Sequence, residues 1–258
     1  EMTSSLVGSE MCIRDRKRQG LSGTTLKLMA CITMLIDHIG ASCLEAGLLV
    51  PLIASGTFST DPAAVSLLQM DRVLRYIGRL AFPIFCFLLV EGFLHTHDVK
   101  RYVERLFLFG LLSEVPFDMA FFRTPFHWGN QNVYWTLALG VLAMVLMQKF
   151  QDAEGNIAWK GRLAALGCVV LAQLLQTDYG AIGVALIVAL YLTRNNRKYQ
   201  CIIGAVMMLF ELTAPLAFVL IWFYNGQRGR CPQWVKWAFY GFYPVHLSIL
   251  AVVTNWVL

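Results

Sequence analysis

The chain has 258 residues, of which 57% are hydrophobic and only 14% charged, and its mean hydropathy is +0.59. A soluble globular domain carries about 25% charged residues, so this composition indicates a polytopic membrane protein with no sizeable soluble domain. The net charge of +5 does not indicate nucleic-acid binding, because cytoplasmic loops of membrane proteins are rich in Lys and Arg. The seven cysteines form no C-x-x-C pair and are interpreted as small buried hydrophobic residues.

Residues 1–16 differ in composition from the rest of the chain. They contain no apolar run and carry Glu1 and Glu10, which excludes a signal peptide. Their sequence is similar to a translated sequencing-adapter tail. We therefore expect a non-native or disordered tail at 1–16 and a single transmembrane domain at 17–258.

Apolar segments long enough to cross a bilayer follow one another along the chain. The sequence predicts helices at roughly 26–44, 73–94, 99–121, 132–149, 162–176, 179–193 and 234–257. A re-entrant or interfacial piece is expected at 45–55 and a loop at 56–69. The predicted fold class is an all-α, polytopic helical bundle of about eight or nine transmembrane helices with short loops.

The apolar run at 199–224 is ambiguous, because Glu211 and Pro215 interrupt it. Its length favours one crossing, since two crossings of about 17 Å each would be strained. Charge favours two, because two crossings place Arg228 and Arg230 on the same side as the basic N-terminal region. Both alternatives stay open, and the positive-inside rule places the N-terminus in the cytoplasm.

Asp37 and His38 lie in the middle of the first apolar segment. An ionisable residue at this depth costs at least about 2.5–3.5 kcal/mol on insertion scales, so it usually marks a functional site. An imidazole titrates near neutral pH and suits a general base, although a neutral histidine bound to a backbone carbonyl is the structural alternative. Adjacent helical residues do not face each other, so Asp37 is expected to pair with Arg79 of the second segment.

Other charged residues accompany this pair at bilayer depth. Arg75 and Arg79 share one stripe of the second segment, and Glu114 lies buried before Pro116 in the third. Arg105 is suited either to hold a phosphate or to extend to the interface. His95 and His97 lie at a loop without other ligands, so no metal site is expected.

Seven blocks, taken in order, resemble the TraX family, which is named for the conjugal-transfer protein that acetylates the N-terminus of F-type pilin. The blocks are LKLMACITMLIDHIG, RYIGRLAFPIFCFLLVEGF, RLFLFGLLSEVPFD, NQNVYWTLALG, TDYGAIG, YNGQRG and FYPVHLSIL. The resemblance runs from about Leu26 to the end of the chain. It is specific because of the order of the blocks, since no single block would identify the family.

The resemblance implies an acetyltransferase of the bacterial inner membrane that uses acetyl-CoA. In related transmembrane acyltransferases a histidine on an early helix is the proposed catalytic residue, and His38 takes that position here. The expected catalytic residues are His38, Asp37, Arg79 and Glu114. The expected acetyl-CoA ligands are Arg101, Arg105, Arg228 and Arg230. Supporting or substrate-binding roles are expected for Arg75, Glu91, Asn132, Asp178, Tyr243 and His246.

The acceptor implied by the resemblance is an amine or hydroxyl group, either a pilin N-terminus or a cell-surface glycan. No nucleophilic Ser or Cys stands beside His38, so direct transfer is favoured over an acyl-enzyme. The alternative is a proton- or anion-coupled transporter that uses the same buried charges as a relay. Transporters often show internal repeats, and none is visible in the sequence. A non-enzymatic membrane scaffold would leave the buried charges unexplained.

Overall fold

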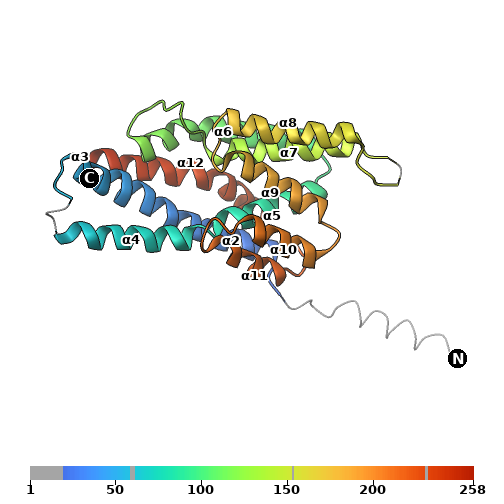
Figure 1. Cartoon of the computed structure of the whole chain (residues 1–258), viewed down its shortest axis with the longest axis horizontal. Helices are drawn as coiled ribbons and strands as arrows, with labels where there is room; N and C mark the ends of the chain where they lie inside the picture. The colour runs from blue at the N-terminus through green and yellow to red at the C-terminus, as the bar shows by residue number, and fades with distance from the viewer. Residues whose placement is uncertain (1–19, 59–61, 153, 230–231) are drawn as a thin grey trace.

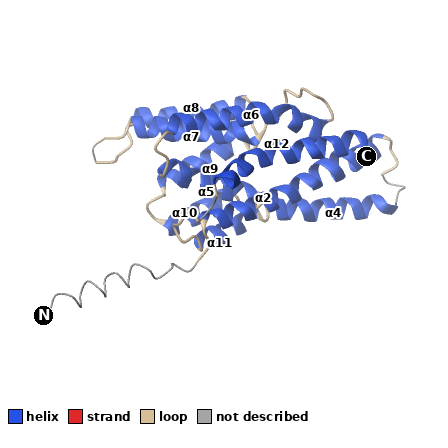
Figure 2. Ribbon diagram, turned by 180° about the vertical axis from the view of Figure 1, so that it is seen from behind, coloured by secondary structure: helices blue, strands red, loops and turns tan. Residues whose placement is uncertain are grey.

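The computed structural model describes residues 20–58, 62–152, 154–229 and 232–258, and within these ranges it contains helices and loops but no strand (Figure 2). The elements are α2 (Gly23–Ile39), the π-helix η1 (Gly40–Leu49), α3 (Val50–Ala54), α4 (Pro62–Gly78), α5 (Ala81–Leu94), α6 (Val99–Phe122), α7 (Val133–Lys149), α8 (Trp159–Leu174), α9 (Gly180–Leu192), α10 (Arg197–Met207), the short 3₁₀ helix η2 (Ala214–Leu216), α11 (Ala217–Trp222) and α12 (Gln233–Trp256). The all-α class is confirmed. The tail expected at 1–16 lies outside the described residues.

The first apolar segment is one continuous helical stretch, Gly23–Ala54. It begins after Ser22, whose side chain caps the first turn of α2. The piece expected at 45–55 as re-entrant or interfacial continues the same helical stretch, because Pro51 falls in the first turn of α3, where a missing N–H is best tolerated. Directly after His38 the stretch widens into η1, and π-helical turns often occur at functional sites.

The second apolar segment is longer than expected and is broken in the middle. α4 already begins at Pro62, so the loop expected at 56–69 is wrong for its second half. Proline favours the first turn of a helix, which explains why the helix starts there. The segment expected as one helix at 73–94 is instead divided between Gly78 and Ala81.

Three helical stretches of the described chain are long and apolar enough to cross a membrane: Gly23–Ala54, Ala63–Leu94 and Trp237–Trp256. α7 and α9 are apolar but shorter. The chain is therefore a membrane protein by the length and composition of these helices. Counted by length and apolar composition, the described part of the chain has three helical stretches that can cross a membrane, fewer than the predicted eight or nine.

The ambiguous run at 199–224 folds as a helical hairpin of α10 and α11. Its two ends meet where the guanidinium of Arg197 lies 5.0 Å from the ring centre of Tyr224. Its turn reaches the break after α4, where Glu211 Oε2 lies 2.9 Å from Arg79 Nε. The chain therefore returns after α11 to the end of the bundle at which α10 began, as the charge argument favoured. The 11 residues of α10 extend only about 16 Å.

The bundle brings distant segments together around one core. α12 lies along α6, while α7, α8 and α9 pack against one another on the opposite side from α4 (Figure 1). Backbone hydrogen bonds join Leu21 N to Phe223 O (2.8 Å) and Thr24 N to Arg228 O (3.0 Å). These bonds place the start of α2 and the loop after α11 at the same end of the bundle.

Candidate active site

A cavity of about 580 Å³ lies in the middle of the bundle, between α2 and η1, the α4–α5 break, α6, the turn before α9, and α12. Its walls are largely apolar and include Phe82, Phe117 and Phe121. Six of the residues singled out by the sequence line it: Asp37, His38, Arg75, Arg79, Asp178 and Tyr243. The cavity therefore brings together six predicted polar residues that lie far apart in the sequence.

Asp37 pairs with Arg75 and not with Arg79, which corrects the expected pairing. Arg75 Nη1 lies 2.6 Å from Asp37 Oδ2, and both side chains are largely buried. Gly78 explains the choice, because the missing side chain lets α2 approach α4 at Asp37. Arg75 lies one turn before Gly78 and reaches Asp37 from the same face of α4. The expectation that Asp37 anchors an arginine of the second segment is confirmed.

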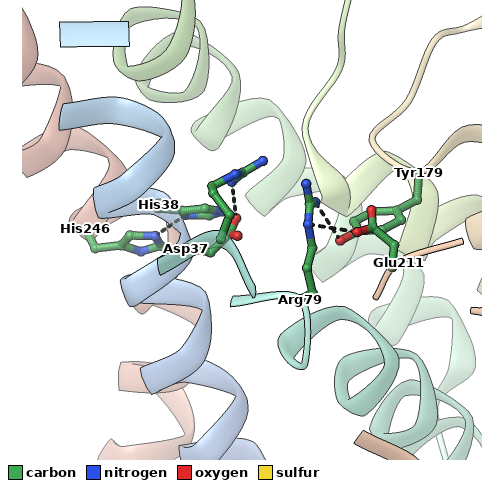
Figure 3. A network of polar contacts seen from close by, with 7 residues as sticks. Asp37, His38, Arg79, Tyr179, Glu211 and His246 are labelled. Carbon is green, nitrogen blue, oxygen red and sulfur yellow. Dashed lines mark hydrogen bonds and ion pairs between the residues drawn. The ribbon is translucent and has the colours of Figure 1, made fainter. Parts of the chain in front are cut away.

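Arg79 lies at the α4–α5 break and binds other partners. Its Nε lies 2.9 Å from Glu211 Oε2, and its Nη1 donates to Tyr179 Oη at 3.5 Å (Figure 3). Thr213 of the same hairpin turn also donates to the backbone carbonyl of Tyr76. Because the helix is interrupted after Gly78, the stripe that placed Arg75 and Arg79 on one face does not continue. Arg79 thus fastens the tip of the hairpin to the wall of the cavity.

His38 pairs with His246 of α12, although 208 residues separate them in the sequence. His38 Nδ1 lies 2.7 Å from His246 Nε2, and the rings stack with 5.0 Å between their centres (Figure 3). The second ring nitrogen of His246, Nδ1, lies 2.7 Å from the backbone carbonyl of Phe242. Among the described residues, the hydrogen bonds and ion pairs of Asp37 and Arg79 go to Arg75, Glu211 and Tyr179, and the side-chain hydrogen bond of His38 goes to His246.

Tyr243 places a hydroxyl group at the same cavity. Its ring packs edge-on against His38 with centres 5.7 Å apart, and only 3% of the residue is exposed. Its Oη finds no acceptor for its proton among the described residues, although the backbone amide of Val133 lies close to it. An unsatisfied buried hydroxyl costs about 1–3 kcal/mol, so it calls for a functional explanation.

Asp178 lies in the turn between α8 and α9, outside the helices. Burial raises the pKa of its carboxyl to about 6, and the nearby carboxylate of Asp37 adds to the rise. The turn itself is fixed, because Thr136 Oγ1 of α7 donates to the backbone carbonyl of Asp178. Asp178 therefore contributes a carboxyl group of adjustable charge to the cavity wall.

A second cavity, of about 640 Å³, lies at the end of the bundle where α2 begins. Lys27, Arg105 and Arg228 line it together with aromatic side chains that include Tyr102 and Tyr240. The Arg105 guanidinium lies 5.7 Å from the centre of the Tyr240 ring, and its buried Nε has no partner within the described ranges. Cationic and aromatic groups together suit a ligand that carries phosphates and a flat ring.

The two cavities lie along the same helix, because Lys27 lines one and His38 the other. These residues share one face of α2 and are about 16 Å apart along its axis. The interval between them holds Cys31 and Met34, which are both buried.

The pattern of the family described as TraX protein matches residues 22–254 of the sequence. The chain belongs to the TraX family.

A similar protein supports the assignment of this chain to the TraX family. The chain is 30% identical over 265 residues to a Dichelobacter nodosus protein named "Probable fimbrial assembly protein FimC, serogroup H1". The alignment covers 89% of this chain and 94% of that protein. No solved structure matches the chain. The family resemblance seen in the seven sequence blocks is confirmed.

Glu114, expected to be catalytic, lines neither cavity of this TraX-family chain. Its Oε2 accepts hydrogen bonds from Asn132 Nδ2 and from Trp135 Nε1, the latter at 2.7 Å. Asn132 is the N-cap of α7, and its Oδ1 accepts from the Tyr134 amide at 3.0 Å. Glu114 and Asn132 therefore hold the start of α7 against α6. This position supports a bracing role for Glu114.

Only some of the expected acetyl-CoA ligands line the second cavity. Arg105 and Arg228 do so. Glu91, expected in a supporting role, also lines this cavity and lies 3.9 Å from Arg197. Arg101 is exposed outside this cavity, and its Nε lies 3.0 Å from Asp98 Oδ2. Arg230 lies outside the described residues. No cluster that could hold a metal ion occurs among the described residues.

Gly78 is the contact point between α2 and α4, which makes Gly78→Ala a test of this packing. A β-carbon there would overlap the side chain of Asp37, and Arg75 holds Asp37 in place. We expect a loss of stability of about 1–3 kcal/mol, measured as a lower unfolding temperature in detergent. The matched control is Gly167→Ala on α8, whose β-carbon meets nothing within 4 Å. An equally small effect of both substitutions would contradict the close approach at Gly78.

Proposed function

We propose that this TraX-family protein is an integral-membrane acetyltransferase that moves an acetyl group from acetyl-CoA to an amine or hydroxyl acceptor. The observation that carries the proposal is the pair of cavities along α2, one cationic and aromatic and the other lined by His38 and Tyr243. A long, thin donor with a phosphorylated nucleotide at one end and a thioester at the other suits two sites about 16 Å apart on one helix face.

The cationic cavity fits the nucleotide end of acetyl-CoA. Lys27, Arg105 and Arg228 supply positive charge, and Tyr102 and Tyr240 supply flat apolar surface. The unsatisfied Nε of Arg105 is a donor that a phosphate oxygen would complete. Acetyl-CoA is made in the cytoplasm, so we place this end of the bundle, with the start of α2, on the cytoplasmic side of the bacterial inner membrane. The basic residues at this end agree with that orientation.

In the central cavity, bound acetyl-CoA supplies a thioester carbonyl that an acceptor attacks. His38 Nε2 takes the proton of the attacking hydroxyl or amine. The Tyr243 hydroxyl donates a hydrogen bond to the oxygen on which negative charge develops. His38 then returns the proton to the leaving sulfur, so the imidazole ends neutral. Asp37 and Arg75 form part of the cavity wall as an ion pair, and neither takes up a proton in these steps.

The acceptor is proposed from the central cavity and from the relative. The relative is named for fimbrial assembly, which favours the N-terminal amine of a pilus or fimbrial subunit. The alternative acceptor is a hydroxyl of a cell-surface glycan. Asp178 favours the amine, because a carboxylate attracts an ammonium group before that group loses its proton.

Binding of acetyl-CoA to the purified chain in nanodiscs tests the cationic cavity. Arg105→Ala is expected to weaken binding about tenfold, because a charge-assisted hydrogen bond to phosphate contributes roughly 1.5–3 kcal/mol. The matched control is Arg101→Ala, which removes the same charge one turn earlier on α6 but outside the cavity. Calorimetry should show unchanged affinity in the control. Equal losses in both variants would refute a specific phosphate site at Arg105.

A further inference from the structure

The hydrogen bonds of the His38–His246 pair determine which nitrogen of each ring carries a proton. His246 Nδ1 lies 2.7 Å from the carbonyl oxygen of Phe242, and His246 Nε2 lies 2.7 Å from His38 Nδ1. A carbonyl oxygen can only accept, so His246 Nδ1 must carry its hydrogen. A neutral imidazole has one N–H, so His246 Nε2 is an acceptor. His38 Nδ1 is then the donor, and the lone pair of His38 lies on Nε2.

The surroundings of the pair favour two neutral rings. The flanking rings are Phe121 and Tyr243 beside His38, and Phe242 beside His246. Asp37 is the nearest carboxylate along the chain, and its Oδ2 is engaged by Arg75 at 2.6 Å. One additional proton on the pair would therefore be a buried charge without a carboxylate partner, which is costly in an apolar site.

We propose that His246 is a positioning residue that fixes His38 in the Nδ1–H tautomer and so presents His38 Nε2 to the central cavity as the base. The inference rests on the proposed function, in which His38 accepts a proton from the acceptor. The orienting partner of a catalytic histidine is often a carboxylate, which holds the tautomer and stabilises the imidazolium by its charge. Here a neutral imidazole does the orienting, and the Phe242 carbonyl fixes the orienting ring in turn.

A neutral partner has a consequence for catalysis. When His38 Nε2 takes a proton, the Nδ1–H bond to His246 becomes charge-assisted and strengthens. No charge moves to His246, because its Nδ1–H stays bound to the carbonyl. The protonated His38 is stabilised less than it would be by a carboxylate, so it returns its proton readily to the leaving sulfur. His38 and His246 thus act as a unit, because the packing of α12 on α2 brings the two rings together.

The test combines ¹⁵N NMR of histidine-labelled full-length chain in nanodiscs with steady-state kinetics. In the wild-type spectrum we expect His38 to show a protonated Nδ1 and an unprotonated Nε2, with signals assigned by their loss in His38→Asn and His246→Leu. In His246→Leu, which removes the acceptor, we expect the Nε2–H tautomer of His38 to appear and kcat to fall about 100-fold. The KM for acetyl-CoA should be unchanged, since the cationic cavity is untouched.

Two further variants separate positioning from general structural support. His246→Gln can place an amide oxygen where Nε2 stands, and it should restore kcat to within about tenfold of wild type. His127→Gln is the control, because His127 stacks on Phe122 and lines neither of the two cavities. A protonated Nε2 on wild-type His38, or a wild-type rate and spectrum in His246→Leu, would overturn the proposal. If wild type fails to transfer acetyl at all, the proposed function fails, while the spectrum still decides the tautomer.

Discussion

His38→Asn is expected to abolish acetyl transfer while leaving the affinity for acetyl-CoA unchanged. The asparagine amide nitrogen stands where Nδ1 stood and can still donate to His246, so the contact between α2 and α12 is kept. The substitution removes Nε2, the atom proposed to take the proton, together with the outer part of the ring that packs on Phe121 and Tyr243. General-base catalysis contributes about 10²–10⁴ in rate, so kcat should fall at least about 100-fold.

The measurement for His38→Asn is the initial rate of labelled acetyl transfer, with acetyl-CoA affinity measured by calorimetry on the same preparation. The binding measurement shows that the variant is folded, because the cationic cavity is lined by residues of α2, α5, α6, the loop after α11 and α12, which only the folded chain brings together. The control is His127→Gln, which lines neither cavity and should keep its kcat. A wild-type kcat in His38→Asn would exclude His38 as the base.

Tyr243→Phe is expected to lower the activity without lowering the stability of the protein. The substitution removes one buried hydroxyl whose proton has no acceptor among the described residues and keeps the ring that packs on His38. Removal of an oxyanion donor costs about 10²–10³ in kcat, while the loss of an unsatisfied buried polar group should leave the unfolding temperature unchanged or raise it.

The matched control for Tyr243→Phe is Tyr134→Phe. The two rings pack edge to face with centres 5.2 Å apart, but the Tyr134 hydroxyl donates to the Tyr240 carbonyl at 3.4 Å. Pro244 cannot donate to that carbonyl, so Tyr134 satisfies it in place of the missing helical bond. Tyr134→Phe should therefore lower the unfolding temperature and change kcat less than tenfold, the reverse of Tyr243→Phe. The same loss of activity in both variants would refute a specific role for the Tyr243 hydroxyl.

Much of the architecture follows from the local pattern of the sequence. The apolar runs predicted at 99–121 and 132–149 became α6 and α7 with ends within two residues of the prediction. Asn132, which directly precedes the apolar run, is the N-cap of α7. These features depend on neighbouring residues, which is why they can be predicted from length, hydropathy and caps alone.

The pairings within the site depend on distant segments and could not be predicted in the same way. The sequence favours Arg79 over Arg75 as the partner of Asp37 because Arg79 lies deeper in its apolar segment, but in the fold Arg79 lies at the break after Gly78 and pairs with Glu211. Glu211 was noted only as an interruption of an apolar run, although an isolated charge there was the signal of a buried partner. The partner of His38 lies on the last helix, so only the packing of α12 on α2 reveals it.

The most direct test of the central claim measures release of coenzyme A by the purified wild-type chain in nanodiscs, with acetyl-CoA and either an N-terminal pilus-subunit peptide or a glycan acceptor. We predict release of coenzyme A that requires one of these acceptors, with the acetyl group recovered on it, and loss of both signals in His38→Asn. Failure of the wild-type chain to bind acetyl-CoA at millimolar concentration, or flux of a solute across proteoliposomes with no acetyl-CoA consumed, would contradict the account.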